Sequence, residues 1–249
     1  LLVDVCVSLD SCIISNAFNI KIFNYIMNAL TIILAESALE PIPDELLNDY
    51  SSTRLDKKNK KTLLDKSFHS HLMEGLVDRE KRGRPDIVHM SVMSVTSTPL
   101  YLTKKIKLYI HTSSNCVFDI GLGVRLPKSY HRFTGLFEQL FSHSSQNKNL
   151  NSLITLNDSS FSELVTSVNS DYVVAFSRHG THITSKDITD KLIHSKNPVL
   201  VIGGFSHGTM SKQVLDSVDA TYSLGNYKLE SHTVCSRMIY ELEKVPGML

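Results

Sequence analysis

The chain has 249 residues, with 26 Lys and Arg against 25 Asp and Glu, so its formal net charge is only +1. This length can bury a full core in one domain or two small ones, and 42% hydrophobic with 20% charged residues is typical of a soluble globular protein. The balance excludes a uniformly polycationic chain. The four cysteines show no Cys-x-x-Cys spacing, which favours reduced thiols over a zinc site.

Basic residues are concentrated in the first half of the chain. Between Arg54 and Arg84 there are ten Lys and Arg against five Asp and Glu, and between Lys104 and Arg132 there are six against one. This distribution indicates an anionic partner on one side of the molecule. A solvated lysine face is the alternative.

Residues 1–26 are apolar but are interrupted by Asp4, Asp10 and Lys21. They are too interrupted for a membrane span and lack the basic start of a signal peptide, so we expect no membrane association and leave this extension unassigned. The apolar run at 30–34 predicts a first strand. Residues 41–61 are polar and predict an exposed insertion.

The next segments predict helices and a hairpin. Apolar residues at helical spacing predict a helix over 62–77, and Arg84-Pro85-Asp86 precedes another predicted helix at 87–95. Asp86 near a helix start suits the helix dipole, and a cap with a surface ion pair to Arg84 is the structural interpretation of both residues. Short strands at 106–110 and 116–120 predict a hairpin.

The basic helix and the region after it complete this part of the chain. Apolar residues on one face predict a helix over 129–141, where Lys128 and Arg132 are four residues apart and can share another face. The Ser/Asn-rich stretch 142–158 predicts a loop or linker.

From residue 172 the pattern alternates between strands and helices. Strands are predicted at 172–176 and 199–202. Helices are predicted from a cap at Ser185 to about residue 194, over 211–218, and after a cap at Ser231. The apolar stripe of the last helix is formed by Val234, Cys235, Met238, Ile239 and Leu242. This alternation predicts a parallel sheet covered on both faces, with ligands beyond the carboxyl ends of its strands.

Two glycine-bearing turns lie close together in this part of the chain. Gly203-Gly204 and Gly208 come directly after an apolar run, and Gly225-Asn226 forms a second turn about twenty residues later. Glycine lets main-chain N–H groups approach a ligand closely. The pattern favours a small-molecule site made mainly of backbone, and an ordinary strand–turn–helix is the alternative.

Six motifs occur in one order along the chain, and together they resemble the pseudouridine N1-specific ribosomal RNA methyltransferases of small-subunit ribosome biogenesis. The resemblance covers residues 29 to the C-terminus. The motifs are Arg84-Pro85-Asp86-Ile87-Val88-His89; Ser97-Thr98-Pro99-Leu100; Tyr109-Ile110-His111-Thr112; Val124-Arg125-Leu126-Pro127 with Arg132-Phe133 and Gly135-Leu136; Gly203-Gly204-Phe205-Ser206-His207-Gly208; and Asn226-Tyr227 with Cys235.

The resemblance implies the SPOUT, or α/β-knot, fold: a mostly parallel sheet covered by helices on both faces, with a C-terminal trefoil knot. It also implies a single domain over 27–249, a basic RNA-binding region at about 84–141, an obligate homodimer, and S-adenosylmethionine held bent by the knot loops. Small-subunit ribosomal RNA and pre-ribosomal assembly factors are the implied partners, and the nucleolus of a eukaryotic nucleus is the implied location.

Carried over residue by residue, the resemblance implies cofactor contacts at two strand ends and along the last loop. Leu224 and Leu229 can sandwich the adenine. Gly204 stands where Ala is common in the family, and Lys228 where Pro is common. The implied cofactor-binding residues are Phe176, Ser177, Gly203, Gly208, Leu224, Gly225, Asn226, Tyr227, Lys228 and Leu229.

The RNA side carries over to Arg84, Arg125, Lys128 and Arg132, whose cations suit an anionic backbone. Lys128 replaces a usual arginine and loses its bidentate fork. For methyl transfer to N1, Asp86 is the candidate for accepting the proton or orienting the ring, and Arg84 for stabilising the developing anion. Asp86 could instead only tie the helix start to Arg84.

Other chemistries have less support. The eleven histidines form no zinc set, and no Gly-x-x-x-x-Gly-Lys-Ser/Thr or Gly-x-Gly-x-x-Gly loop occurs, so neither a metal nor a dinucleotide enzyme is expected. The alternative function is a non-catalytic assembly factor that binds pre-ribosomal RNA on the same fold.

Overall fold

The computed structural model describes residues 29–46, 61–143 and 153–245. Residues 1–28 and most of the predicted insertion lie outside these ranges. The described strands are β1 (Leu30–Ser37), β2 (Ile106–Thr112), β3 (Cys116–Ile120), β4 (Ile154–Asp158), β5 (Tyr172–His182), β6 (Pro198–Gly203) and β7 (Ala220–Ser223). The described helices are α3 (Lys66–His69), α4 (Pro85–Thr96), α5 (Pro99–Leu102), α6 (Tyr130–His143), α7 (Phe161–Val168), α8 (Ser185–Leu192), α9 (Lys212–Leu215) and α10 (Ser231–Glu243).

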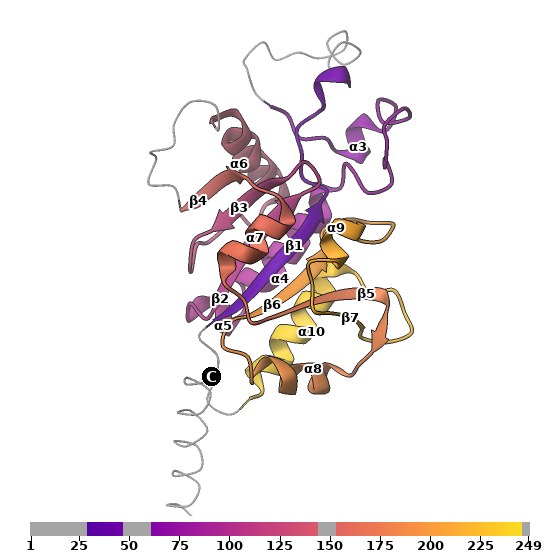
Figure 1. The fold of residues 1–249 in the computed structure, drawn as a ribbon. Helices are drawn as coiled ribbons and strands as arrows, with labels where there is room; N and C mark the ends of the chain where they lie inside the picture. Colours follow the sequence, from indigo (N-terminus) through magenta and orange to yellow (C-terminus); the bar gives the residue numbers. More distant parts are fainter. Residues whose placement is uncertain (1–28, 47–60, 144–152, 246–249) are drawn as a thin grey trace, which may run out of the picture.

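The strands form one seven-stranded sheet in the order β4-β3-β2-β1-β6-β5-β7 (Figure 1). β1 pairs in parallel with β2 and β6, and β5 pairs in parallel with β6 and β7. The β2–β3 and β3–β4 pairs are antiparallel. The predicted α/β class with a mostly parallel sheet is confirmed.

Helices cover both faces of this sheet, and β1 shows why. Its Leu30, Ile32 and Leu34 side chains join the core beneath α4, α6, α8 and α10, whereas Ile33 and Ala35 join the core beneath α7 and α9 (Figure 1). Buried on both faces, β1 is apolar from Ile32 to Ala35, and its polar residues are Thr31 near its start and Glu36 and Ser37 at its end. The carboxyl ends of the parallel strands consequently meet at one edge.

Two helices on one face set the geometry of the site. α4 begins with Pro85 at its first turn, and α10 buries the apolar stripe that its spacing predicted. Glu243 near the end of α10 accepts a hydrogen bond from Leu100 N, 3.1 Å away, just after α4 ends. At the opposite end of the two helices, the negative charge of Glu230, which precedes α10, acts on Arg84, which precedes α4. The two helices therefore run in parallel with their N-termini together.

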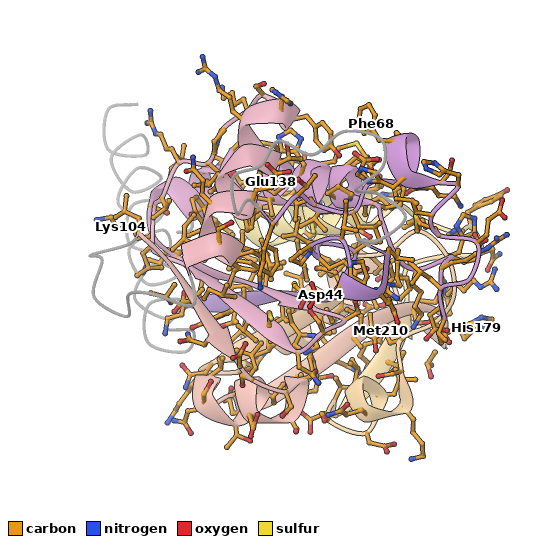
Figure 2. The ribbon with its side chains drawn as sticks, turned by 90° about the horizontal axis from the view of Figure 1, so that it is seen from above. Asp44, Phe68, Lys104, Glu138, His179 and Met210 are labelled. Atoms are coloured by element: carbon orange, nitrogen blue, oxygen red, sulfur yellow. The ribbon has the colours of Figure 1, made fainter. Side chains whose placement is uncertain are left out.

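The predicted helix over 62–77 is wrong. Only Lys66–His69 is α-helical, because Asp65 caps it and Leu63 pairs instead with Pro41 in an antiparallel bridge. Phe68, assigned to the apolar face, is 72% exposed and points outward in Figure 2. Residues 41 and 42, placed in an exposed insertion, belong to this packing, since Ile42 is buried.

Several boundaries also differ from the prediction. Residues 154–158, predicted as loop or linker, form edge strand β4. The helix predicted at 211–218 is the shorter α9, with Ser211 as its cap. Thr184 rather than Ser185 caps α8. Ser231 does not cap α10, because its hydroxyl donates instead to Gly203 O.

Candidate methyl-donor pocket and RNA face

A cavity of about 190 Å³ lies at the carboxyl edge of the sheet, lined by residues 176–178 within β5 and by the loops after β6 and β7. Eight of the ten residues predicted to contact a cofactor line it: Phe176, Ser177, Gly203, Gly208, Leu224, Tyr227, Lys228 and Leu229. Gly225 and Asn226 lie within the same last loop but are not among the lining residues. The fold therefore brings these eight residues together around one cavity. Their contacts with a cofactor stay a prediction.

Sequence reasoning missed other lining residues. They include Arg178, Ile202, Phe205, Tyr222, Ser231 and Val234. β7 was not predicted, so Tyr222 could not be placed at a strand end. Val234 was assigned only to a core stripe, although its position at the start of α10 is the available signal.

Main-chain geometry explains the glycines of the first loop. Gly208 has φ +95°, a conformation that L side chains rarely adopt. A Cβ on Gly203 would lie 2.9 Å from Phe205 Cε1. A Cβ on Gly204 would lie 2.2 Å from Ser37 Oγ and 2.8 Å from Ser37 Cα. Gly204 therefore allows the loop to pack on the end of β1, and it does not line the cavity.

Polar contacts tie the loops to one another. Ser231 donates to Gly203 O, and Lys228 Nζ donates to Ser206 O at 2.6 Å. Ser223 Oγ donates to Gly225 O at 2.8 Å. The cavity therefore has cross-linked walls, glycine main chain and apolar leucines. These features fit an adenosyl group, which needs close main-chain approach and an apolar slot.

One wall carries a perturbed phenol. Lys191 Nζ donates to Tyr222 Oη at 2.9 Å and lowers the pKa of Tyr222, while the Tyr172 hydroxyl lies 3.2 Å from the same oxygen. The Lys191 ammonium group is therefore held against Tyr222, the residue of β7 that lines the cavity.

The Arg84–Asp86 pair forms the predicted reactive centre at the start of α4. Arg84 Nε and Nη2 donate to Asp86 Oδ1 and Oδ2, both at 2.8 Å, and the side chains are 35% and 39% exposed. Burial pushes the pKa of Asp86 up, but the hydrogen bonds and charge of Arg84 outweigh it and leave this pKa below its ordinary value. The carboxylate is therefore ionised at neutral pH and still reaches solvent.

The Arg84–Asp86 pair does not line the cavity, but it lies at the start of α4, which packs beside α10. Glu230 is the residue before α10, and its charge acts on Arg84. Ser231 and Val234, in the first turn of α10, line the cavity. A substrate held against the Arg84–Asp86 pair would thus lie next to the proposed donor pocket.

The other predicted RNA-binding cations lie in and just after a loop that contacts α4. Arg125 and Lys128 are in the loop before α6 and Arg132 is in its first turn; all three are exposed, and none forms an ion pair with the residues that the structure describes. His89 of α4 joins the two elements, with Nε2 3.3 Å from Pro127 O and its ring 4.7 Å from that of Phe133. Free guanidinium and ammonium groups are available for phosphates.

A second contact fixes α6 against the 62–84 segment. The Tyr130 hydroxyl donates to Asp65, and burial together with this carboxylate raises the pKa of Tyr130. Asp65 Oδ1 also caps α3 by accepting from Ser67 N at 2.8 Å. Within the described ranges, no group of His, Cys, Asp and Glu could hold a metal ion.

Comparison with known proteins decides the family. The family model described as EMG1/NEP1 methyltransferase matches residues 32–243. The chain belongs to the EMG1/NEP1 methyltransferase family. The resemblance identified from the sequence motifs is confirmed, and so is its methyltransferase class.

Individual relatives agree over nearly the full matched length. The ribosomal RNA small subunit methyltransferase Nep1 of Staphylothermus marinus is 34% identical over 225 residues, covering 88% of this chain and 97% of the relative. That of Sulfurisphaera tokodaii is 33% identical over 224 residues, covering 84% and 94%. The crystal structure of Archaeoglobus fulgidus Nep1 bound to S-adenosylhomocysteine is 30% identical, with a TM-score of 0.72 and coverage of 87% and 97%.

Proposed function

We propose that this protein methylates N1 of a pseudouridine in small-subunit ribosomal RNA, with S-adenosylmethionine as methyl donor. The observation that carries the proposal is the Arg84–Asp86 ion pair close to the start of α10, whose first turn lines the cavity. Family membership supports it, as does the Archaeoglobus relative solved with S-adenosylhomocysteine. The named relatives are methyltransferases, so nothing in them favours a non-catalytic assembly factor.

The proposed pocket holds the donor through main chain and leucines. Gly203 and Gly208 bring the backbone against the ligand, and Leu224 and Leu229 cover the adenine. When bound, S-adenosylmethionine supplies an electrophilic methyl group on a sulfonium. The remaining work of this chain is to bring N1 of an unstacked nucleotide into line with it.

Asp86 and Arg84 divide the remaining chemistry. As the N1–carbon bond forms, N1–H becomes acidic, and the Asp86 carboxylate accepts its proton. Arg84 keeps Asp86 ionised and faces the negative charge that develops on a ring carbonyl oxygen. Arg125, Lys128 and Arg132 bind the RNA backbone so that the target base reaches this point.

A single-turnover assay of Asp86→Asn tests this assignment. Loss of the base should lower the rate of methyl transfer by about 10²-fold or more, because positioned proton transfer contributes about 10²–10⁴-fold. Binding of S-adenosylhomocysteine should be retained, which controls for folding and for the pocket. A near-normal rate in the folded variant would leave Asp86 with only the structural role of holding Arg84.

The finer expectations on assembly and location belong to this proposal. A C-terminal trefoil knot is supported by the meeting of residues 176–178 of β5 with the loops after β6 and β7 at one cavity. A homodimer is supported by the exposed Met90 and Tyr240 on the neighbouring helices α4 and α10. Light scattering on the purified protein tests the dimer, and a monomeric mass would refute it.

Assembly-factor partners and a nucleolar location rest on the resemblance alone. The relatives named above are archaeal, and archaea have no nucleolus, so these comparisons do not support the nucleolus. Separately, none of the helices in the described ranges has the length and apolar character that crossing a bilayer requires.

A further inference from the structure

The segment before Arg84 packs against the outer side of the loop that lines the cavity. Ser206 Oγ donates to Glu80 O at 2.9 Å, and Lys81 Nζ lies 4.7 Å from the centre of the Phe205 ring. A Cβ on Gly208 would lie 3.0 Å from Lys81 Cε. Lys81 thus contacts the 203–211 loop at two points while lying outside the cavity.

Glu36 holds Lys81 from the other side. Lys81 Nζ lies 3.0 Å from Glu36 Oε2, with side chains only 23% and 11% exposed. The two Glu36 carboxylate oxygens also accept from Ser211 N, at 3.0 and 3.2 Å. One carboxylate therefore fixes the end of the loop directly and its middle through Lys81.

The backbone of Glu36 is itself constrained. Its φ is +48°, in the left-handed region that a non-glycine residue rarely adopts. Its N–H donates to His111 Nδ1 at 3.4 Å, and burial lowers the pKa of His111, which favours the neutral ring that can accept this bond. Such conformations persist where surrounding contacts over-determine them, and they cluster at functional sites.

The same segment leads directly to the reactive pair. Arg82 Nε and Nη2 donate to Glu40 at 2.7 and 2.8 Å, and Gly83, with φ +64°, then turns the chain into Arg84. Residues 80–84 therefore connect the wall of the cavity to the start of α4. A change at Lys81 should disturb the 203–211 loop more than Arg84, because Glu40 holds Arg82, which lies between Lys81 and Arg84.

We propose that Glu36 and Lys81 are positioning residues that hold the 203–211 loop in the shape required to bind S-adenosylmethionine. This inference rests on the proposed role of the cavity as the donor site. The pair acts through Phe205, Gly208 and Ser211 and does not touch the ligand. Both residues line a second cavity of about 460 Å³ together with His111, which leaves room for water once either partner is removed.

Calorimetric titration with S-adenosylhomocysteine tests the pair. Lys81→Met should raise the Kd about tenfold, equivalent to about 1.4 kcal/mol. It should raise the KM for S-adenosylmethionine more than it lowers kcat, while RNA affinity changes less than about twofold. Glu36→Gln should shift the Kd in the same direction, and Lys81→Arg should restore most of the affinity. Lys212→Met removes a lysine from an exposed pair with Asp216, at 86% and 59% exposure, and should change nothing.

Thermal unfolding and a pocket variant separate the outcomes. A lowered Tm in Lys81→Met with an unchanged Kd would mean that the pair only stabilises the fold, and would overturn the inference. Leu229→Asp, within the cavity, should abolish binding. Loss of binding in Leu229→Asp with normal binding in Lys81→Met and Glu36→Gln would refute the positioning role alone. Normal binding in Leu229→Asp would refute the donor pocket itself.

Discussion

The proposed donor cavity and the proposed RNA face are built in different ways. The cavity is made of main chain from loops that hydrogen-bond to one another, with glycines where a Cβ has no room. The RNA face is made of the ends of charged side chains, of which Arg84 and Asp86 hold each other while Arg132 is exposed. The first should therefore respond to added volume, and the second to lost charge and to salt.

The largest expected effect is a steric one beside the cavity. Gly204→Ala places a Cβ against Ser37 Oγ and Cα, and overpacking against backbone should lower the free energy of unfolding by about 2 kcal/mol. Gly135→Ala in helix α6 is the control, because a Cβ there meets nothing within 4 Å. Since Ala has a higher helix propensity than Gly, this change should raise the free energy of unfolding by about 1 kcal/mol. Urea unfolding measures both, and equal responses would contradict the close approach of Gly204 to β1.

A smaller effect is expected from charge on the RNA face. Arg132→Ala should weaken RNA binding severalfold and reduce the slope of log affinity against log salt by about 0.7 for one lost phosphate contact. S-adenosylhomocysteine affinity should not change. Fluorescence anisotropy at several salt concentrations measures this slope, with Lys196→Ala as a control for an exposed lysine elsewhere. An unchanged slope for Arg132→Ala would remove it from the RNA contact.

The smallest effect concerns the pH dependence of the Arg84–Asp86 pair. Because the folded pKa of Asp86 is depressed, the pair stabilises the fold above the unfolded value of about 4 and loses this contribution as pH falls through the folded pKa. Both side chains are more than a third exposed, so the pair contributes less than about 1 kcal/mol to the free energy of unfolding. Arg84→Met should therefore cost more stability at pH 7 than at pH 3. A cost independent of pH would contradict this.

Local signals predicted much of the fold. The apolar run of β1, the Pro85 start of α4 and the apolar face of α6 correspond to elements of the structure. The helix over 62–77 failed because a tertiary pairing of Leu63 with Pro41 overrides its helical spacing. α7 went unpredicted although Ser160 and Glu163 form a capping box that is readable in the sequence.

In the candidate site, too, local motifs were predictable from the sequence and contacts between distant residues were not. Glycine turns and ordered motifs indicated eight of the cavity residues and the Arg84–Asp86 pair. The contacts that hold the loops could not be read, because Ser206 meets Glu80 from 126 residues away and Glu36 meets Ser211 from 175. Only the completed sheet brings such positions together.

A crystal structure of this protein with S-adenosylhomocysteine tests the central claim most directly. We expect the ligand in the cavity lined by β5 and the loops after β6 and β7, with its adenine between Leu224 and Leu229 and main chain from Gly203 and Gly208 against it. Its sulfur should face the Arg84–Asp86 pair. A ligand bound instead in the cavity beside His111 and Glu36 would contradict the account.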